Sequence, residues 1–530
     1  MSGMNRREFV GLTAASIIGA LAVPGSAAGR ATMQTGRFHE ATIADLRRLM
    51  ETGEATSVDI VKGYLHNIDL FDGRVNSIIE RNPDAEAIAA RLDAERKDGK
   101  VRGPLHGIPV VLKDNIDTAD KMKTTAGSLA LVNAPTPARD AFLVERLRAA
   151  GAVILAKTNL SEWANFRSSN SISGWSGRGG QTRNPYILDR NPCGSSSGSG
   201  AAVSANLAAA AIGTETDGSI VCPASICGVV GLKPTVGLIS RSGIIPIAHS
   251  QDTAGPMTRT VADAAILLSA MTMADPRDTA TAENRAKIRT DYEKFLSKDG
   301  LKGARIGVAR NYWGRRDEVD RAMDASLQAI KDAGAELIDV RFDSIGKFGD
   351  AEYQILLYEF KADLEKYLTD RGGDHKTLAD LIRFNEDNAA REMPYFKQEI
   401  FEEAAKKGPL TETAYLDAVK KARQLTRTQG IDAVMDANKL AAVVAPSNAP
   451  TWMIDTVNGD CGSGYVSSSA LAAVSGYPNI TVPAGFERGL PLGISFFGRA
   501  YSEPLLIKFA YAFEQATNAR QAPRFLDTAI

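Results

Sequence analysis

Two glycine-rich segments that contain serine lie close together in the chain, at Cys193–Gly200 (CGSSSGSG) and Gly213–Ser219 (GTETDGS). Glycine beside serine lets backbone N–H groups approach a small anion. The small apolar residues between the two segments allow them to fold back toward one site. Because a serine hydroxyl needs a base to become a nucleophile, the pattern predicts serine chemistry that depends on a third, more distant residue.

The candidate base is Lys113, which ends the apolar run Gly107–Leu112 (GIPVVL). Lysine accepts a proton only when it is neutral, and burial lowers the pKa by disfavouring the ammonium form. The neighbouring Asp114 is expected to point to the opposite face of the strand. Taken alone, Lys113 is more often a strand-end lysine that keeps its amine in water. Its combination with the two serine segments favours a base.

Ser219 follows Thr216, Asp217 and Gly218, whose consecutive backbone N–H groups can curl into a nest. Acyl transfer requires a nucleophile, a proton acceptor and donors aimed at the developing oxyanion. The segment therefore places a hydroxyl and its oxyanion donors together.

The sequence resembles the amidase signature family, which uses a Ser-cisSer-Lys triad. The resemblance lies in the order of Lys113, Gly194-Ser195-Ser196 and Gly213–Ser219. The resemblance extends over nearly the whole chain after residue 28, through Gly107–Pro109, Lys157–Asn159, Thr182–Pro185 and the closing segment Gly476–Arg499. It implies an α/β fold, with one large domain in which helices cover a central mixed β-sheet. It also implies a hydrolase that needs no metal or organic cofactor.

The resemblance assigns Ser219 as nucleophile, Ser195 as bridging serine and Lys113 as base. The family keeps 24 residues between the bridging serine and the nucleophile, and Ser195 and Ser219 have this spacing. The Gly194–Ser195 peptide bond is then expected to be cis. The remaining assigned residues are the oxyanion-hole N–H groups of Thr216, Asp217, Gly218 and Ser219, and the supporting Gly194 and Ser196.

Three positions depart from the family pattern. Ser197 replaces a glycine that often follows the serine pair, Asp217 replaces one of two glycines before the nucleophile, and Val221 stands where many members carry arginine. These differences weaken the similarity to the tRNA-dependent amidotransferase. Glu215–Pro223 is most similar to bacterial peptide amidases, which release ammonia from C-terminally amidated peptides. The expected substrate is a C-terminal peptide amide, with an aryl or acyl amide or ester as the alternative.

Two other classes of protein are compatible with parts of the pattern. Gly194–Gly198 matches the nucleophile elbow of α/β-hydrolases, with Ser196 as nucleophile. That motif needs a hydrophobic strand directly before it, which Leu188–Cys193 cannot form. A non-catalytic binding protein is the other class, and the intact Lys113, Ser195 and Ser219 argue against it.

The bulk composition indicates a globular protein with a small substrate. The 530 residues are 44% hydrophobic and 24% charged, with a formal net charge of −1 from 62 basic and 63 acidic residues. This even mixture leaves no basic footprint for nucleic acid. We expect a small molecule or short peptide amide of neutral or mixed polarity as the substrate.

Residues 1–28 resemble a twin-arginine export signal. Arg6-Arg7 precedes the uncharged run Val10–Val23, and Pro24–Ala28 offers small residues for cleavage. The apolar run is too short to span a bilayer, so no stable membrane insertion is expected after removal of the signal. The alternative is a buried N-terminal helix. The mature enzyme, residues 29–530, is expected in the periplasm or outside the cell.

Four cysteines are present, at Cys193, Cys222, Cys227 and Cys461. An oxidising compartment would allow disulfides. Buried free thiols are favoured, because cysteine packs as a small hydrophobe near the tight glycine-rich loops. No histidine lies near them in sequence, which argues against a zinc site.

The elements that must position these residues alternate between helix and strand, which favours an α/β architecture. We expect a signature core at about 105–260, a helical insertion at about 275–435, and C-terminal strands with a closing helix at about 440–517. Pocket walls are expected from loops and the insertion, with Trp163, Trp175, Tyr353, Tyr358 and Trp452 as candidates. The expected helices are 43–51, 58–70 (capped by Ser57), 84–95, 141–150, 200–207 and 503–516. One strand is expected to end at Lys113, and the other expected strands span 153–156, 441–445, 479–484 and 492–497.

Overall fold

The structure is a computed structural model that describes residues 36–462 and 464–529. The predicted export signal, residues 1–28, lies outside the described residues. Among the described helices, none is long and apolar enough to cross a membrane.

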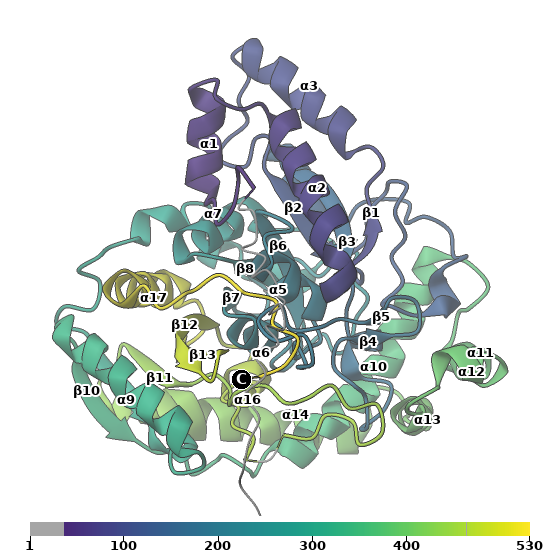
Figure 1. Cartoon of the computed structure of the whole chain (residues 1–530). Helices are drawn as coiled ribbons and strands as arrows, with labels where there is room; N and C mark the ends of the chain where they lie inside the picture. Colours follow the sequence, from purple (N-terminus) through teal and green to yellow (C-terminus); the bar gives the residue numbers. More distant parts are fainter. Residues whose placement is uncertain (1–35, 463, 530) are drawn as a thin grey trace, which may run out of the picture. The chain divides into compact units, whose positions relative to one another are not determined.

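Eleven strands form one mixed sheet, in the order β1-β3-β2-β6-β8-β7-β12-β13-β11-β9-β10 (Figure 1). Strand β2 is parallel to both β3 and β6, and β9 is parallel to β10 and β11, while the other neighbours are antiparallel. The strands of this sheet are β1 (Ile78–Arg81), β2 (Pro109–Lys113), β3 (Val153–Thr158), β6 (Ala210–Glu215), β7 (Val230–Lys233), β8 (Thr253–Thr258), β9 (Arg305–Ala309), β10 (Glu336–Val340), β11 (Ala442–Pro446), β12 (Asn479–Glu487) and β13 (Leu490–Phe497). Strands β4 (Trp175–Ser176) and β5 (Gly180–Gln181) form a separate hairpin.

Helices flank the sheet (Figure 1). Their bounds are α1 (Ile43–Glu51), α2 (Ser57–Val75), α3 (Ala85–Lys97), α4 (Phe142–Ala149), α5 (Ser197–Ser204), α6 (Val221–Ile226), α7 (Val261–Met271), α8 (Thr279–Glu283), α9 (Asp317–Asp332), α10 (Gly349–Arg371), α11 (Leu378–Asp387), α12 (Ala389–Glu392), α13 (Glu399–Ala405), α14 (Thr413–Arg423), α15 (Asp432–Asn438), α16 (Ala470–Ser475) and α17 (Glu503–Thr517). Short α5 and α6 pack against the central strands. Helix α17 packs against both α7 and α9; α7 also contacts β7 and β8, and α17 and α9 contact β12. The predicted α/β class, with a central mixed sheet covered by helices, is confirmed.

Most predicted elements are present, and two differ in instructive ways. Helix α2 is capped by Thr56, whose side chain accepts the Asp59 N–H, and not by Ser57 as predicted. Ser57 lies inside the first turn, where its hydroxyl donates to the Gly107 carbonyl at 2.9 Å. Its hydroxyl is therefore used to join α2 to the segment before β2.

The region of about 275–435 is not purely helical. Strands β9 and β10 lie within it and form one edge of the main sheet. Strand β10 occupies the outermost position, and only its last residue, Val340, is buried. Its sequence ELIDV is short and lacks a regular alternation of polar and apolar residues, which explains why no strand is evident there from sequence.

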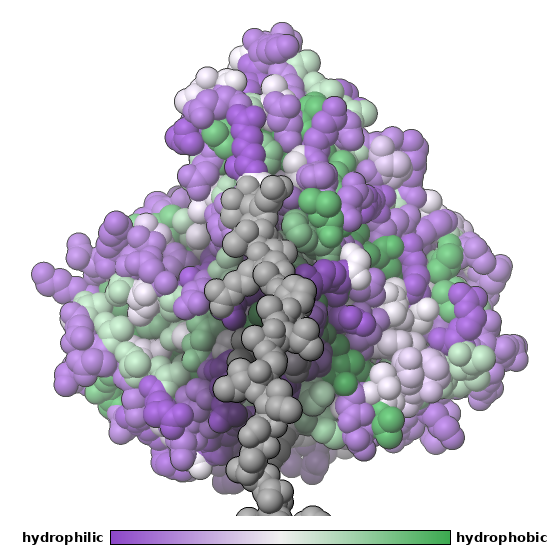
Figure 2. Space-filling view, in the orientation of Figure 1, coloured by the Kyte–Doolittle hydropathy of each residue, from purple (hydrophilic) through white to green (hydrophobic). Residues whose placement is uncertain are grey.

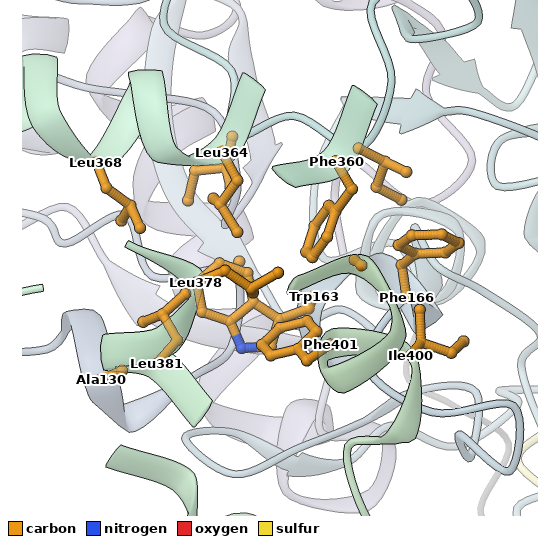
Figure 3. Close-up of a cluster of buried hydrophobic side chains, with 14 of the residues drawn as sticks. Ala130, Trp163, Phe166, Phe360, Leu364, Leu368, Leu378, Leu381, Ile400 and Phe401 are labelled. Carbon is orange, nitrogen blue, oxygen red and sulfur yellow. The ribbon is translucent and has the colours of Figure 1, made fainter. Parts of the chain in front are cut away.

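Helix α10 is fixed by a buried hydrophobic cluster, shown in Figure 3. Phe360 and Leu364 of α10 face Trp163 and Phe401, and the Phe360 and Phe401 ring centroids lie 5.2 Å apart. Trp163 meets Phe401 edge to face at 5.7 Å. Since such aromatic pairs add to the free energy gained by burial, the cluster holds α10 firmly against the loop after β3.

The surface shown in Figure 2 is mainly hydrophilic, with hydrophobic side chains scattered among charged ones. Among the large hydrophobic side chains of the described residues, Val457, Leu70 and Met453 have the highest exposed fractions. Single exposed hydrophobic residues of this kind are normal for a globular protein.

Candidate active site

The predicted site forms at the carboxyl ends of β2 and β6. These strands are parallel neighbours, with Leu112 opposite Ile212. Lys113 is the last residue of β2 and Glu215 the last of β6. Because carboxyl ends of parallel strands meet at one edge of a sheet, the side chains that follow gather there, as ligand sites do in other α/β proteins.

Lys113 is fully buried and contacts both a serine and a threonine. Its Nζ lies 2.7 Å from Ser195 Oγ, 2.8 Å from Thr214 Oγ1 and 3.2 Å from the Thr214 carbonyl oxygen. Loss of solvation lowers the pKa of Lys113 from 10.5 to about 7, and the negative charges of Asp252 and Glu215 act in the opposite direction. A substantial fraction of the amine is therefore neutral near pH 7.

Ser195 lies in the turn before α5, and the Gly194–Ser195 peptide bond is cis, as the resemblance implies. A Cβ atom at Gly194 would come within 2.1 Å of Ser161 Oγ, so only glycine fits. The Ser161 N–H donates to the Ser195 carbonyl at 3.1 Å. These contacts fix the backbone that presents the Ser195 hydroxyl to Lys113.

Ser196 has a structural role. Its Oγ donates to the Thr214 carbonyl at 3.0 Å and accepts the Thr214 N–H at 3.1 Å, and the side chain is fully buried. No strand is formed by the residues immediately before it. The nucleophile elbow considered from sequence is therefore not formed. The two hydrogen bonds of Ser196 hold its loop against β6.

Ser219 is 8% exposed and borders a cavity together with Asp217 and Gly218. Gly218 has φ of +78°, a conformation that favours glycine. Within residues 36–462 and 464–529, the N–H groups of Asp217, Gly218 and Ser219 donate to no other residue. They are available to an incoming anion, as the predicted oxyanion hole requires.

Glu215 closes the loop that carries Ser219. Its Oε2 accepts the N–H groups of Ile220 at 2.7 Å and Val221 at 3.0 Å. This carboxylate joins the end of β6 to the start of α6, so that the residues between them are held in a tight arc. Sequence reasoning did not assign it a role, although it lies inside the motif.

Asp252 was also missed. Thr216 Oγ1 donates to its Oδ1 at 2.6 Å, and the N–H groups of Ile247 and Ala248 donate to Oδ2 at 2.8 and 2.9 Å. Burial raises the pKa of Asp252 to about 6. Only the pairing of β6 with β8 brings it close to Lys113.

Two cavities border the site and share part of their walls, including Thr216 and Ile247. One, of about 620 Å³, borders Ser219, and the other, of about 580 Å³, borders Ser195. Of the predicted aromatic wall residues, Trp452 lines the first cavity. The others pack elsewhere: Trp163 in the cluster around α10, Trp175 against Phe396, Tyr353 with its hydroxyl on Glu403, and Tyr358 with its hydroxyl on Glu412. Phe166 and Tyr465, which sequence reasoning did not select, also line the first cavity.

The prediction of free thiols is wrong for two of the four cysteines. Cys193 and Cys222 form a disulfide with a Cα–Cα distance of 6.1 Å, which joins the loop before Ser195 to the helix after Ser219. The folding back of the two loops brings these residues together. Cys227 is a buried free thiol whose pKa is raised by burial, and Cys461 is a free thiol on the surface.

One group of described residues could hold a metal ion, at His249, Glu359 and Asp363. Its atoms already bind within the protein: the His249 N–H donates to Asp363 at 3.0 Å, and the Tyr415 hydroxyl donates to Glu359 at 2.7 Å. The first bond fastens the loop between β7 and β8 to α10, and the second joins α14 to α10. His106, which lies shortly before β2, contacts the Leu92 carbonyl at 2.9 Å through Nε2.

The fold and site define a class of protein. It is an α/β protein in which a buried lysine contacts one serine, while a second serine borders a cavity and follows backbone N–H groups that have no acceptor among the described residues. The Amidase family profile matches residues 59–507. A probable amidase of Arabidopsis thaliana is 42% identical over 95% of this chain and 95% of its own length. A putative amidase of Schizosaccharomyces pombe is 38% identical over 92% of this chain and 87% of its own.

Among solved structures, the native peptide amidase of Stenotrophomonas maltophilia is 50% identical, covers 92% of this chain and 99% of its own, and superposes with a TM-score of 0.88. The chain therefore belongs to the amidase family and is an amide-hydrolysing enzyme.

Proposed function

We propose that this chain hydrolyses C-terminal peptide amides to the free acid and ammonia, through an acyl-enzyme formed on Ser219. The observation that carries the proposal is the 2.7 Å contact between buried Lys113 Nζ and Ser195 Oγ, in a loop whose Ser196 N–H donates to the Ser219 carbonyl at 3.2 Å. The 50% identity to the Stenotrophomonas maltophilia peptide amidase supports the choice of substrate.

In the proposed mechanism, neutral Lys113 accepts the proton of Ser195 while Ser195 accepts the proton of Ser219. Ser219 Oγ attacks the amide carbon, and the N–H groups of Thr216, Asp217, Gly218 and Ser219 stabilise the oxyanion. The relay then runs backwards: the proton returns through Ser195 to the leaving nitrogen, and ammonia departs. Water attacks the acyl-enzyme by the same route and releases the acid. The fixed backbone of both serine loops reduces the reorganisation needed at each step.

The cavity beside Ser219 supports a substrate with a side chain and a short peptide extension. Its volume of about 620 Å³ falls within the range of sites that hold small ligands, and its walls combine Phe166, Trp452 and Tyr465 with serine hydroxyls. Aromatic walls suit apolar side chains, and the hydroxyls suit peptide polar groups. A small aryl amide would use only part of this surface.

The test measures ammonia release from N-acetyl-L-phenylalaninamide, and amine release from the matching 4-nitroanilide and 3-phenylpropionanilide. We expect the peptide-type amide to have the highest kcat/KM. Ser219→Ala should abolish turnover, whereas Ser297→Ala, a control serine outside both cavities, should not change it. Equal activity of the Ser219→Ala variant would refute Ser219 as the nucleophile, and a preference for 3-phenylpropionanilide would favour the aryl-amide alternative.

Covalent labelling gives an independent test of the nucleophile. A fluorophosphonate should add to Ser219 Oγ, with loss of fluoride, and peptide mass spectrometry should locate the adduct there. An adduct on Ser196 would support the nucleophile elbow instead. Lys113→Met should slow labelling, and Lys298→Met, which changes an exposed lysine, should not.

We also propose that the protein is exported through its twin-arginine-like segment. Changing both Arg6 and Arg7 to lysine keeps the positive charge and removes the paired arginines. In a Gram-negative host we expect the wild type in the periplasmic fraction and the double variant in the cytoplasm. Equal export of both would refute the proposal.

A further inference from the structure

Two acidic residues line the cavity beside Ser219, Asp217 and Asp460, and the proposed mechanism uses neither carboxyl group. Asp217 contributes its N–H to the nest, and the residue is partly exposed. Its Oδ1 is shielded from solvent and forms no hydrogen bond with any residue of the described chain. The rest of the carboxyl group hydrogen-bonds with the side chains of Ser469 and Glu352. A buried carboxylate oxygen without a donor is costly, so the group has capacity for one further donor, which a substrate in the cavity can supply.

Glu352, in the first turn of α10, is the neighbour of Asp217. The two carboxyl groups are in contact, and Gln251 Nε2 donates to Glu352 Oε1 at 3.1 Å. Two carboxylates in contact cannot both be ionised, so they share a proton. Burial raises the pKa of Glu352 to about 8 and that of Asp217 to about 6. The pair therefore carries one negative charge near neutral pH.

Asp217 is the acidic residue of the cavity wall that can accept a further hydrogen bond. Among the described residues that line it, the other acidic one is Asp460, and none is lysine or arginine. Asp460 is already satisfied: it accepts the Ser173 N–H at 3.0 Å, Asn191 Nδ2 at 3.1 Å and Trp452 Nε1 at 3.0 Å. The wall thus favours a hydrogen-bond donor on the substrate and disfavours an anion.

We infer that the Asp217 carboxylate accepts a hydrogen bond from the N–H group on the carbon next to the scissile carbonyl, and so selects amides of α-amino acids over plain acyl amides. This inference rests on the proposed function, because it assumes that the substrate carbonyl lies between Ser219 and the nest. In an α-amino acid amide, that nitrogen is about 2.5 Å from the carbonyl carbon, since only two covalent bonds separate them. Asp217 is two residues before Ser219, so one loop holds both the carbonyl and the neighbouring N–H.

The inference explains a departure from the family pattern. Asp217 replaces a glycine, and a negative charge beside an oxyanion hole would oppose the oxyanion. The N–H of the substrate offsets this cost by binding the charge. Glu352 holds the shared proton and limits the pair to a single charge.

The test compares two substrates that differ in one atom. N-acetyl-L-phenylalaninamide has the N–H group, and O-acetyl-L-3-phenyllactamide has an ester oxygen at the same position. Only ammonia release is measured, so that cleavage of the ester does not contribute. We expect the wild type to prefer the first substrate by about 10- to 100-fold in kcat/KM, the range of a hydrogen bond to a charged group.

Asp217→Ala should reduce this preference to less than about threefold, mainly by slowing the first substrate. Asp350→Asn, which removes an exposed carboxylate from the same turn of α10, should leave it unchanged. Fluorophosphonate labelling at Ser219 verifies that each variant is folded. If Asp217→Ala does not fold, Asp217→Asn keeps the size and removes the charge, and should also lower the preference.

Three results would overturn the inference. A wild type without preference, or an Asp217→Ala variant that slows both substrates by one factor, would do so while the proposed function stands. A wild type that hydrolyses neither amide and takes no label at Ser219 would refute the proposed function and the inference with it.

Discussion

Replacing Lys113 by methionine tests whether the protein holds this lysine neutral. The pKa of Lys113 is lowered from 10.5 to about 7 by burial. At about 1.4 kcal/mol for each tenfold change, this interval corresponds to about 5 kcal/mol by which the folded protein disfavours the ammonium form. Methionine has a similar size and no charge, so the variant removes this cost together with the base.

Catalysis should follow the neutral fraction of the amine. With a pKa of about 7, the neutral fraction rises from about one tenth at pH 6 to about nine tenths at pH 8, so wild-type kcat/KM should increase about ninefold over that range and then level off. Lys113→Met should lose about 10²- to 10⁴-fold at every pH. Asp252→Asn should move the rise to lower pH, because the Asp252 charge raises the pKa of Lys113. A rate that rises only near pH 10.5 would refute a buried neutral lysine.

Stability gives a second readout that does not depend on turnover. Between pH 7 and 10.5 the unfolded chain holds a proton on Lys113 that the folded protein does not, so the free energy of unfolding rises with pH in this window. From pH 7 to 9 the wild type should gain about 2 kcal/mol relative to Lys113→Met, because Lys113 is already half deprotonated at pH 7 in the folded protein; this is about 2 °C in Tm for a chain of this size. Lys298→Met should follow the wild type. Parallel pH dependence of wild type and Lys113→Met would contradict the assigned pKa.

Other consequences of the structure can be tested with single changes. Replacing Cys193 and Cys222 by serine should lower the free energy of unfolding by about 3 to 4 kcal/mol, because the bridge closes a loop with a sequence separation of 29 residues; unchanged urea midpoints would contradict this. Glu215→Gln should lower kcat about tenfold or more and shift the pH–rate profile to lower pH, since the Glu215 charge raises the pKa of Lys113; an unshifted profile would count against it. Phe360→Ala should cost about 3 to 5 kcal/mol in chemical denaturation, and a cost under about 1 kcal/mol would show that the cluster around α10 does not hold the helix.

Local sequence was sufficient to select the candidate site residues because the chemistry proposed for them lies in short segments. Lys113 ends an apolar strand, and Gly194 and Gly218 occupy backbone positions where a side chain would clash or be strained. Such requirements act over a few residues, so they leave a recognisable pattern. The helix 43–51 was predicted for the same reason, since its apolar residues recur on one face.

Other features depend on contacts between distant segments and had no local signal. Cys193 and Cys222 meet because two loops fold onto each other, and Asp252 reaches the site only through the pairing of β8 with β6. Strand β10 was missed because an edge strand buries few residues.

By itself, the sequence determined the amidase family and the α/β class, because these depend on residue types in fixed local order. Only the tertiary structure decided which walls surround Ser219. Glu352 contacts Asp217 because α10 is fixed by a buried hydrophobic cluster, which lies more than one helical turn after Glu352. Trp452 lines the cavity beside Ser219, whereas Trp163 does not. Substrate selection depends on such long-range packing, because a cavity is formed by side chains from segments that no local pattern connects.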